Sequence, residues 1–126
     1  VNRMLRRWEA GAKCFREYLK YEPFHDGAWL ELTWCLSETS DLVAAEAAAR
    51  RTIELFPGNA GAWGNLALVL MRRGERAAAR AALDRALELD PEDAKNRLND
   101  ERFDEHYRIL SARSEPERTR VAEEPN

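Results

Sequence analysis

The chain has 126 residues, of which 44% are hydrophobic and 34% are charged, and it carries a formal net charge of −3. This composition excludes a disordered chain, and the lack of a basic excess argues against a nucleic-acid-binding protein. Valine and isoleucine are scarce beside alanine, arginine, glutamate and leucine, so the composition favours helices over a sheet. Because no run of about 18 apolar residues occurs, we expect no insertion into a membrane.

The first predicted element is a helix over residues 2–21, where apolar side chains recur at helical spacing. These side chains are Met4, Trp8, Phe15 and Leu19. Residues 1–20 carry six basic and two acidic groups, whereas residues 21–57 carry two basic and seven acidic groups. We interpret both as ordinary solvated surface, although the opposite charges could also bring the ends of two molecules together.

A period of 34 residues runs through the middle of the chain. It relates Pro23, Pro57 and Pro91 to one another, and it also relates Trp29 to Trp63. A fixed period of this length is typical of a protein built from helix–turn–helix repeats. We therefore divide this part of the chain into two units, residues 26–59 and residues 60–93.

The second unit carries a regular series of large and small side chains. With Ala60 as position 1, it has Trp63 at 4, Leu66 at 7, Ala67 at 8, Leu70 at 11, Gly74 at 15, Ala79 at 20, Leu83 at 24, Ala86 at 27 and Pro91 at 32. The series resembles the tetratricopeptide repeat, and the first unit repeats the frame from Asp26 without a gap. The resemblance implies an all-α, right-handed α-solenoid with two full units, a partial amino-terminal unit and a carboxy-terminal capping helix.

Extended backwards, the same frame assigns residues 1–25 to an amino-terminal helix that is the second half of a partial repeat. Gly11, Phe15 and Tyr18 then fall at positions 20, 24 and 27 of that unit. The arrangement indicates either an array that continues upstream or a single helix that caps the array. We favour the first interpretation.

After Pro91 the frame predicts a helix of a different character over residues 94–110, with Asp90 as its N-cap. The positions that pack in the other units are now charged (Arg97, Asp100, Glu101 and Asp104), and the apolar side chains are Leu98, Phe103, Tyr107 and Leu110. This pattern resembles the solvating helix that closes a repeat array. Residues 111–126, with two prolines and mixed charge, are predicted to form a mobile tail.

The resemblance also implies where a partner would bind, because the first helices of such repeats line a concave groove. The residues that we expect to form a peptide-binding site on that face are Leu30, Trp34, Asn65, Leu68, Met71, Arg72 and Lys95. The apolar members form either a recognition strip or a cover for the inside of a curved array, since they are costly to leave in water. Asn65 is similar to the asparagine with which such grooves hold a ligand's backbone, and Gly64 leaves room for close approach.

Lys95 matches one basic position of the carboxylate clamp that some members of this family use. Leu30, Trp34 and Asn99 replace other residues of that clamp. We therefore expect a groove that suits an internal, partly apolar peptide or a helix rather than a free carboxy terminus.

No arrangement of residues in the sequence suggests catalysis. The two histidines, His25 and His106, are far apart, and Cys14 and Cys35 fit neither a metal motif nor a disulfide framework. We expect both thiols to behave as small hydrophobes in apolar surroundings. The sequence thus predicts a protein that is not an enzyme and that uses no cofactor and no metal.

The predicted function is that of a protein–protein interaction module, a scaffold or assembly adaptor that binds a peptide or helical segment of a partner protein. The alternative is a structural or self-association domain of a larger multi-domain protein. In that case an open repeat end, with Met4, Leu5 and Trp8, would form a homo-oligomer. Reduced cysteines and the lack of a visible targeting segment favour a cytoplasmic location, and the Ala/Arg-rich composition suggests a bacterial source.

Overall fold

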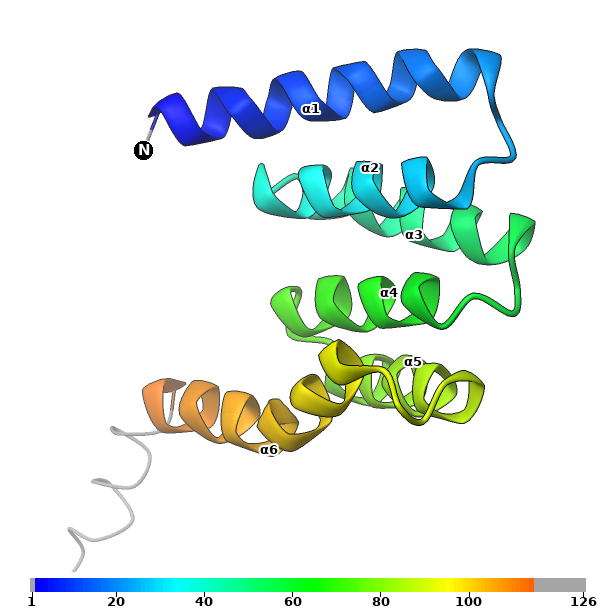
Figure 1. Ribbon diagram of the computed structural model, residues 1–126. Coiled ribbons are helices and arrows are strands. Elements are labelled where there is room, and N and C mark those ends of the chain that lie inside the picture. The colour runs from blue at the N-terminus through cyan, green and yellow to red at the C-terminus, as the bar shows by residue number, and fades with distance from the viewer. Residues whose placement is uncertain (1, 115–126) are drawn as a thin grey trace, which may run out of the picture.

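The computed structural model describes residues 2–114, which form six helices and no strand. The helices are α1 (Asn2–Tyr21), α2 (Asp26–Glu38), α3 (Leu42–Leu55), α4 (Ala60–Arg72), α5 (Arg76–Leu89) and α6 (Ala94–Ser114). Figure 1 shows them stacked in chain order, with α1 at one end and α6 at the other. The predicted all-α repeat solenoid is confirmed.

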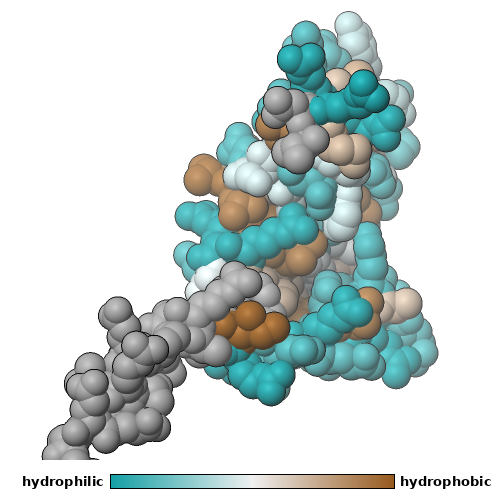
Figure 2. Space-filling view, turned by 90° about the vertical axis from the view of Figure 1, so that its left-hand side faces the viewer, coloured by the Kyte–Doolittle hydropathy of each residue, from teal (hydrophilic) through white to brown (hydrophobic). Residues whose placement is uncertain are grey.

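Each helix packs against its neighbours in the chain, and α4 also contacts both α2 and α6. The helices α2, α4 and α6 therefore form a continuous row along one side of the stack. Since α2 and α4 are the first helices of the two predicted units and α6 is the predicted capping helix, the row supplies the surface on which the candidate site lies. Figure 2 shows a mainly hydrophilic face on which hydrophobic residues form separate patches.

Alanines allow the helices of this stack to approach closely. Ala45 and Ala49 on α3, Ala67 on α4 and Ala79 on α5 have no exposed surface. A side chain that ends at Cβ keeps two helix axes close, and larger residues such as Leu70 and Leu83 fill the space beside it. In the 34-residue pattern, the small residues thus lie where helices approach closely, and the large residues fill the space between helices.

Two repeated hydrogen bonds explain why proline and tryptophan share one spacing. The indole Nε1–H of Trp29 donates to the carbonyl oxygen of Pro23 at 2.9 Å. Trp63 makes the same bond to Pro57 at 3.2 Å. Each bond ties the segment that enters a first helix to the first turns of that helix, so the two residue types recur six positions apart.

The turns within the two units have the same backbone conformation. Gly74, between α4 and α5, has a φ of 77°, a left-handed conformation that glycine adopts readily. Ser40 stands 34 residues earlier, between α2 and α3, and has a φ of 67°. Asp41 then caps α3, because its Oδ1 atom accepts a hydrogen bond from the backbone N–H of Ala44 at 3.1 Å.

Helix α6 differs from the sequence prediction at both ends. Its cap is Asp93, whose Oδ1 accepts from the N–H of Asn96 at 2.9 Å, and not Asp90, whose carboxylate accepts from the N–H of Glu92 instead. The helix also continues through residues 111–114, which the sequence assigns to the tail. None of those four residues breaks a helix, and the first proline after them is Pro116. The rest of the predicted tail, residues 115–126, lies outside the described residues.

One aromatic side chain anchors α6 on the last repeat. Phe103 is 2% exposed and lies in the same buried cluster as Leu70 and Leu83. The guanidinium groups of Arg76 and Arg80 stand 5.9 and 4.8 Å from the centre of its ring. The ring is therefore held by apolar contacts and by cation–π attraction.

The outward side of α6 is polar, as the sequence predicts. Its four charged positions, Arg97, Asp100, Glu101 and Asp104, are all exposed. Leu98, which the sequence assigns to the covering stripe, is only partly covered, with 42% of its surface exposed. The side chains of the other two members of that stripe, Tyr107 and Leu110, lie outside the described part of the structure.

Candidate binding groove

A groove of about 580 Å³ runs along the row formed by α2, α4 and α6. Its lining consists of Leu30, Glu31, Trp34, Gly61, Gly64, Asn65, Leu68, Arg72, Asp93, Lys95, Asn96, Leu98 and Asn99. Six of the seven residues predicted for a peptide-binding site are in this set. The 34-residue period thus brings together side chains that are more than 60 positions apart in the chain.

Met71 is the predicted site residue that does not line the groove. It is 6% exposed and belongs to the buried cluster that also contains Leu70 and Phe103. The reason is helical geometry: Met71 lies one turn after Ala67, which faces the neighbouring helices and has no exposed surface. Met71 therefore stabilises the fold of the last repeat and its side chain is not available in the groove.

Trp34 and Lys95 meet across the groove. The Lys95 ammonium on α6 lies 4.7 Å from the centre of the Trp34 ring on α2. This cation–π contact joins the first and last helices of the row. A bound molecule that stacks on Trp34 has to share the ring face with Lys95 or displace it.

The polar residues predicted to hold a ligand also join the repeats to each other. The amide Nδ2 of Asn65 donates to the backbone carbonyl of Leu30 at 3.4 Å. Arg72 donates to the carbonyl oxygen of Ser37 at 3.2 Å and to its hydroxyl, and it pairs with Glu38 at 3.4 Å. Within residues 2–114 the Oδ1 atom of Asn65 has no hydrogen-bond partner, so this acceptor is the part of the amide that a ligand could engage.

The space beside Gly64 is filled by the protein itself. A Cβ atom on Gly64 would stand only 2.1 Å from the Oδ1 atom of Asn96, which is 3% exposed. Gly64 therefore admits Asn96 of α6 rather than a ligand, contrary to the sequence prediction. The signal for this packing lies in the repeat frame, where Asn96 occupies the position held by Ala28 and Ala62 in the two preceding units. The larger residue at that position needs a glycine opposite.

The groove carries charges of both signs. Glu31 and Asp93 lie in the same lining as Arg72 and Lys95. Behind it, burial raises the pKa of the Cys35 thiol, and the nearby carboxylates of Glu31 and Glu38 raise it further. The thiolate form of Cys35 is thus disfavoured.

The described residues 2–114 contain no group of three or more His, Cys, Asp or Glu side chains that could hold a metal ion. No helix among them has the length and hydrophobicity that a membrane span requires.

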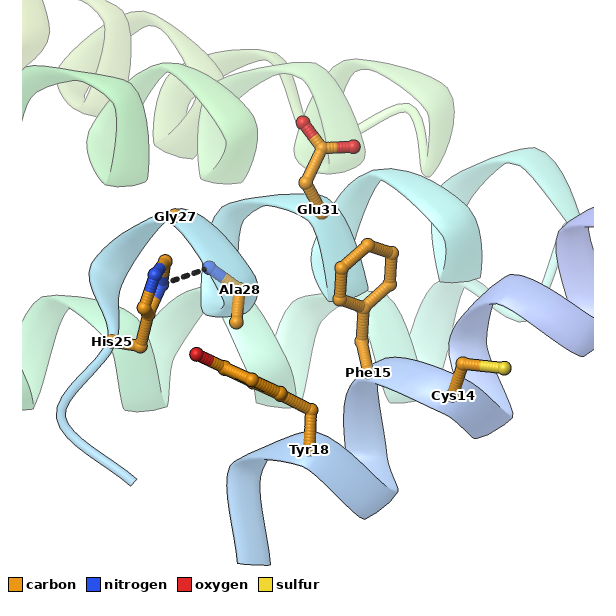
Figure 3. Close-up of a pocket in the computed structure, with 7 residues that line it drawn as sticks. All are labelled: Cys14, Phe15, Tyr18, His25, Gly27, Ala28 and Glu31. Atoms are coloured by element: carbon orange, nitrogen blue, oxygen red, sulfur yellow. Dashed lines mark hydrogen bonds between the residues drawn. The ribbon is translucent and has the colours of Figure 1, made fainter. Parts of the chain in front are cut away.

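A second cavity, of about 520 Å³, lies between α1 and α2 (Figure 3), and we call it the α1–α2 slot. Its lining is Cys14, Phe15, Tyr18, His25, Gly27, Ala28 and Glu31. The Nδ1 atom of His25 caps α2 by accepting from the N–H of Ala28 at 3.0 Å, and the Tyr18 ring meets the imidazole edge-on at 5.4 Å. Cys14 is exposed there, unlike Cys35, so only one of the two thiols is a buried hydrophobe.

Fold and groove together define a helical repeat protein with an open concave surface. Two sequence models of the tetratricopeptide repeat match the chain, one over residues 5–60 and the other over residues 38–97. The chain belongs to the tetratricopeptide-repeat family. No protein of curated function matches its sequence.

Several solved structures share the fold. The first TPR of Spaghetti (RPAP3), bound to the HSP90 peptide SRMEEVD, is 12% identical, with 83% of this chain and 81% of that chain covered and a TM-score of 0.71. The TPR2B domain of yeast Sti1, in a complex with pHsp70, is 23% identical (85% and 85% covered, TM-score 0.68). The Yersinia enterocolitica type III secretion chaperone SycD, with a peptide of the translocator YopD, is 17% identical (86% and 82% covered, TM-score 0.69).

Proposed function

We propose that this protein is a non-catalytic interaction module that binds a polypeptide segment of a partner protein in the groove along α2, α4 and α6. The observation that carries the proposal is that six residues chosen from the sequence for this role line one groove. The three similar solved structures each hold a peptide or protein partner, which supports binding of the same chemical class here.

The chemistry of the groove favours a segment with both apolar and polar groups. Leu30, Trp34 and Leu68 are half-buried and offer apolar contact, for which a fully buried side chain contributes about 1.5–3 kcal/mol. The free Oδ1 acceptor of Asn65 suits a backbone N–H of the segment. Charges of both signs at Glu31 and Lys95 would fix its direction.

A library of random twelve-residue peptides displayed on phage provides the test, with the whole chain as bait. Peptides selected on the wild type are then titrated against Leu68→Glu, which places a charge in the groove, and against Val43→Glu. Val43 is 70% exposed on α3, outside the groove, and serves as the matched control. We expect binding to fall at least tenfold in the first variant and to be unchanged in the second. Equal affinity for both variants would place the binding surface elsewhere.

A structural role in self-association is the second candidate. It is supported by the exposure of large apolar side chains on α1, where Met4 is 51% exposed and Leu5 is 38% exposed. A role as scaffold or adaptor within a larger assembly is compatible with either candidate.

A further inference from the structure

Helix α1 has one helix neighbour fewer than its counterparts in the repeats. Among the described helices, α3 packs between α2 and α4, and α5 packs between α4 and α6. Helix α1, which occupies the same place in the repeat frame, packs against α2 alone. One face of α1 therefore lacks the helix that covers the corresponding face of α3.

The α1–α2 slot is the place that this helix would fill. The residues of α3 that lie one period after Cys14, Phe15 and Tyr18 are Ala48, Ala49 and Thr52. These three residues of α3 are buried, with 7%, 0% and 0% of their surface exposed. Tyr18, by contrast, is 44% exposed and Cys14 is exposed as well. The surface that a neighbouring helix covers in the first full unit is thus open in the slot.

Glycines at equivalent positions lead to the same conclusion. On Gly61 an added Cβ would lie 3.3 Å from a methyl group of Leu30, which belongs to the preceding first helix. On Gly27, 34 positions earlier, an added Cβ would meet only His25, the residue that caps the same helix. The slot therefore has room for an apolar side chain. The helix that carries this side chain would lie against α2 in the same way as α2 lies against α4.

The chain does not turn back into the slot at the point where a repeat would. In the first full unit the turn ends at Asp41, and α3 begins at Leu42. The equivalent residues, Arg7 and Trp8, lie inside α1, which is helical from Asn2 onwards. Figure 1 shows α1 running well past the end of α2. Within Asn2–Tyr21 there is therefore no short turn of the kind that leads into α3.

The occupant of the slot has to be a helix with an apolar stripe and a basic flank. Asn65, whose amide donates to the backbone of α2, is replaced at the equivalent slot position by Glu31, which can only accept hydrogen bonds when ionised. Glu31 has no ion-pair partner within residues 2–114, so a basic group on the occupant would complement it. Helix α2 as a whole carries three acidic residues and no basic residue.

Helix α1 of a second copy has these properties. It carries six basic and two acidic residues, a net charge of +4 against −3 for α2, and it exposes Met4, Leu5 and Tyr18. Helix α6, at the other end of the stack, is a poorer occupant because its outward side has one basic residue, Arg97, beside Asp100, Glu101 and Asp104. We propose that two copies associate reciprocally, with α1 of each copy lying in the α1–α2 slot of the other.

The α1–α2 slot and the groove share one lining residue, Glu31, and their other lining residues differ, so a dimer formed through the slot leaves most of the groove open. The test is sedimentation velocity of the whole chain over a range of protein concentrations and at low and high salt. We expect a concentration-dependent dimer that weakens as salt rises, because opposite charges face each other. A monomer at every concentration, or an open series of larger species, would overturn the proposal.

Variants locate the interface. Tyr18→Glu puts a charge on the apolar stripe of α1 at an exposed position, and we expect it to weaken dimerisation at least tenfold while the circular dichroism of the fold is retained. Val43→Glu, equally outside the core, should dimerise as the wild type does. A dimer that is indifferent to Tyr18→Glu would show that another surface is responsible.

The thiol of Cys14 gives a readout that needs no substitution. Because Cys14 lines the slot and is exposed in a single copy, its alkylation by iodoacetamide should slow as the protein concentration rises into the dimer range. An unchanged rate in solutions that are dimeric by sedimentation would contradict occupation of the slot.

Discussion

The Oδ1 atom of Asn96 occupies the space beside Gly64. If residue 64 had a Cβ atom, that atom would lie 2.1 Å from this oxygen. Two first helices, α4 and α6, thus approach each other through a glycine on one and a buried amide on the other. The amide Nδ2 of Asn96 has no hydrogen-bond partner in the described structure. This contact holds α6 against α4, and both residues form part of the lining of the groove.

The first prediction concerns this pair. Gly64→Ala forces Asn96 to move although it is 97% buried, and overpacking of this kind costs about 1–3 kcal/mol. Asn96→Ala restores the alanine found at the same position of the other units, and we expect it to be neutral or stabilising because it removes an unpaired donor. Urea unfolding of both single variants and of the double variant measures the coupling. The double variant should recover the loss; additive effects would show that the two residues do not interact.

The second prediction concerns Ser40, a residue other than glycine with a left-handed backbone (φ 67°). Ser40→Gly should raise the free energy of unfolding by about 1 kcal/mol, because glycine adopts this conformation without a steric penalty. Gly74→Ser, at the equivalent turn, should lower it by a similar amount. Thermal unfolding measures both changes. If Ser40→Gly proves destabilising, the turn after α2 has a different conformation in solution.

The third prediction concerns the anchor of α6. Phe103→Ala removes a ring that is 2% exposed, and truncations of this kind cost about 3–5 kcal/mol. Hydrogen exchange should show that amides of α6 lose protection first, because this helix packs against α4 and α5 and otherwise reaches α2 only through the exposed Lys95–Trp34 contact. Phe24→Ala, at a position 73% exposed, is the control and should change stability by no more than about 0.5 kcal/mol.

The fourth prediction concerns pH. Hydrogen bonds from Arg50 and Arg73 lower the pKa of Glu46 although partial burial opposes them. A carboxyl whose pKa is lower in the folded state stabilises the fold at neutral pH and loses that contribution as pH falls through the folded-state pKa. Glu46→Gln should therefore be less stable than the wild type near neutral pH, and the gap should close in acid, below the usual glutamate value of about 4.3. Thermal unfolding of both proteins along a pH series measures the gap. A gap that is constant with pH would remove ionisation from the explanation.

The fifth prediction concerns the tryptophan–proline bonds. Trp63→Phe keeps an aromatic ring but removes the Nε1–H that donates to Pro57. A neutral hydrogen bond contributes about 0.5–1.5 kcal/mol, and we expect a loss within that range because the bond is exposed. Trp29→Phe should behave alike, since its bond to Pro23 has the same geometry. Urea unfolding measures both losses, and a much larger loss in either variant would indicate that ring packing dominates.

Local signals in the sequence were sufficient for the helices and for most of the groove. The 34-residue period placed Leu30, Leu68 and Lys95 on corresponding faces of three helices, and the structure brings them to one groove. The period succeeds because each first helix packs in the same orientation on the one before it, so equivalent positions face the same way. The left-handed turn at Gly74 was also predictable, because glycine adopts a positive φ without a steric penalty.

Contacts between helices decided what the period alone could not. Whether the space beside Gly64 is open depends on the side chain that α6 places there, and Asn96 fills it. Met71, one turn after the buried Ala67, lies in a buried cluster with Leu83 of α5 and Phe103 of α6, so its side chain is packed between helices. The sequence by itself determined the repeat, its helices and the row of residues along one side. Only the tertiary structure decided which of those residues are free, because a position's register fixes its direction but its neighbours determine whether solvent, another helix or a partner lies there.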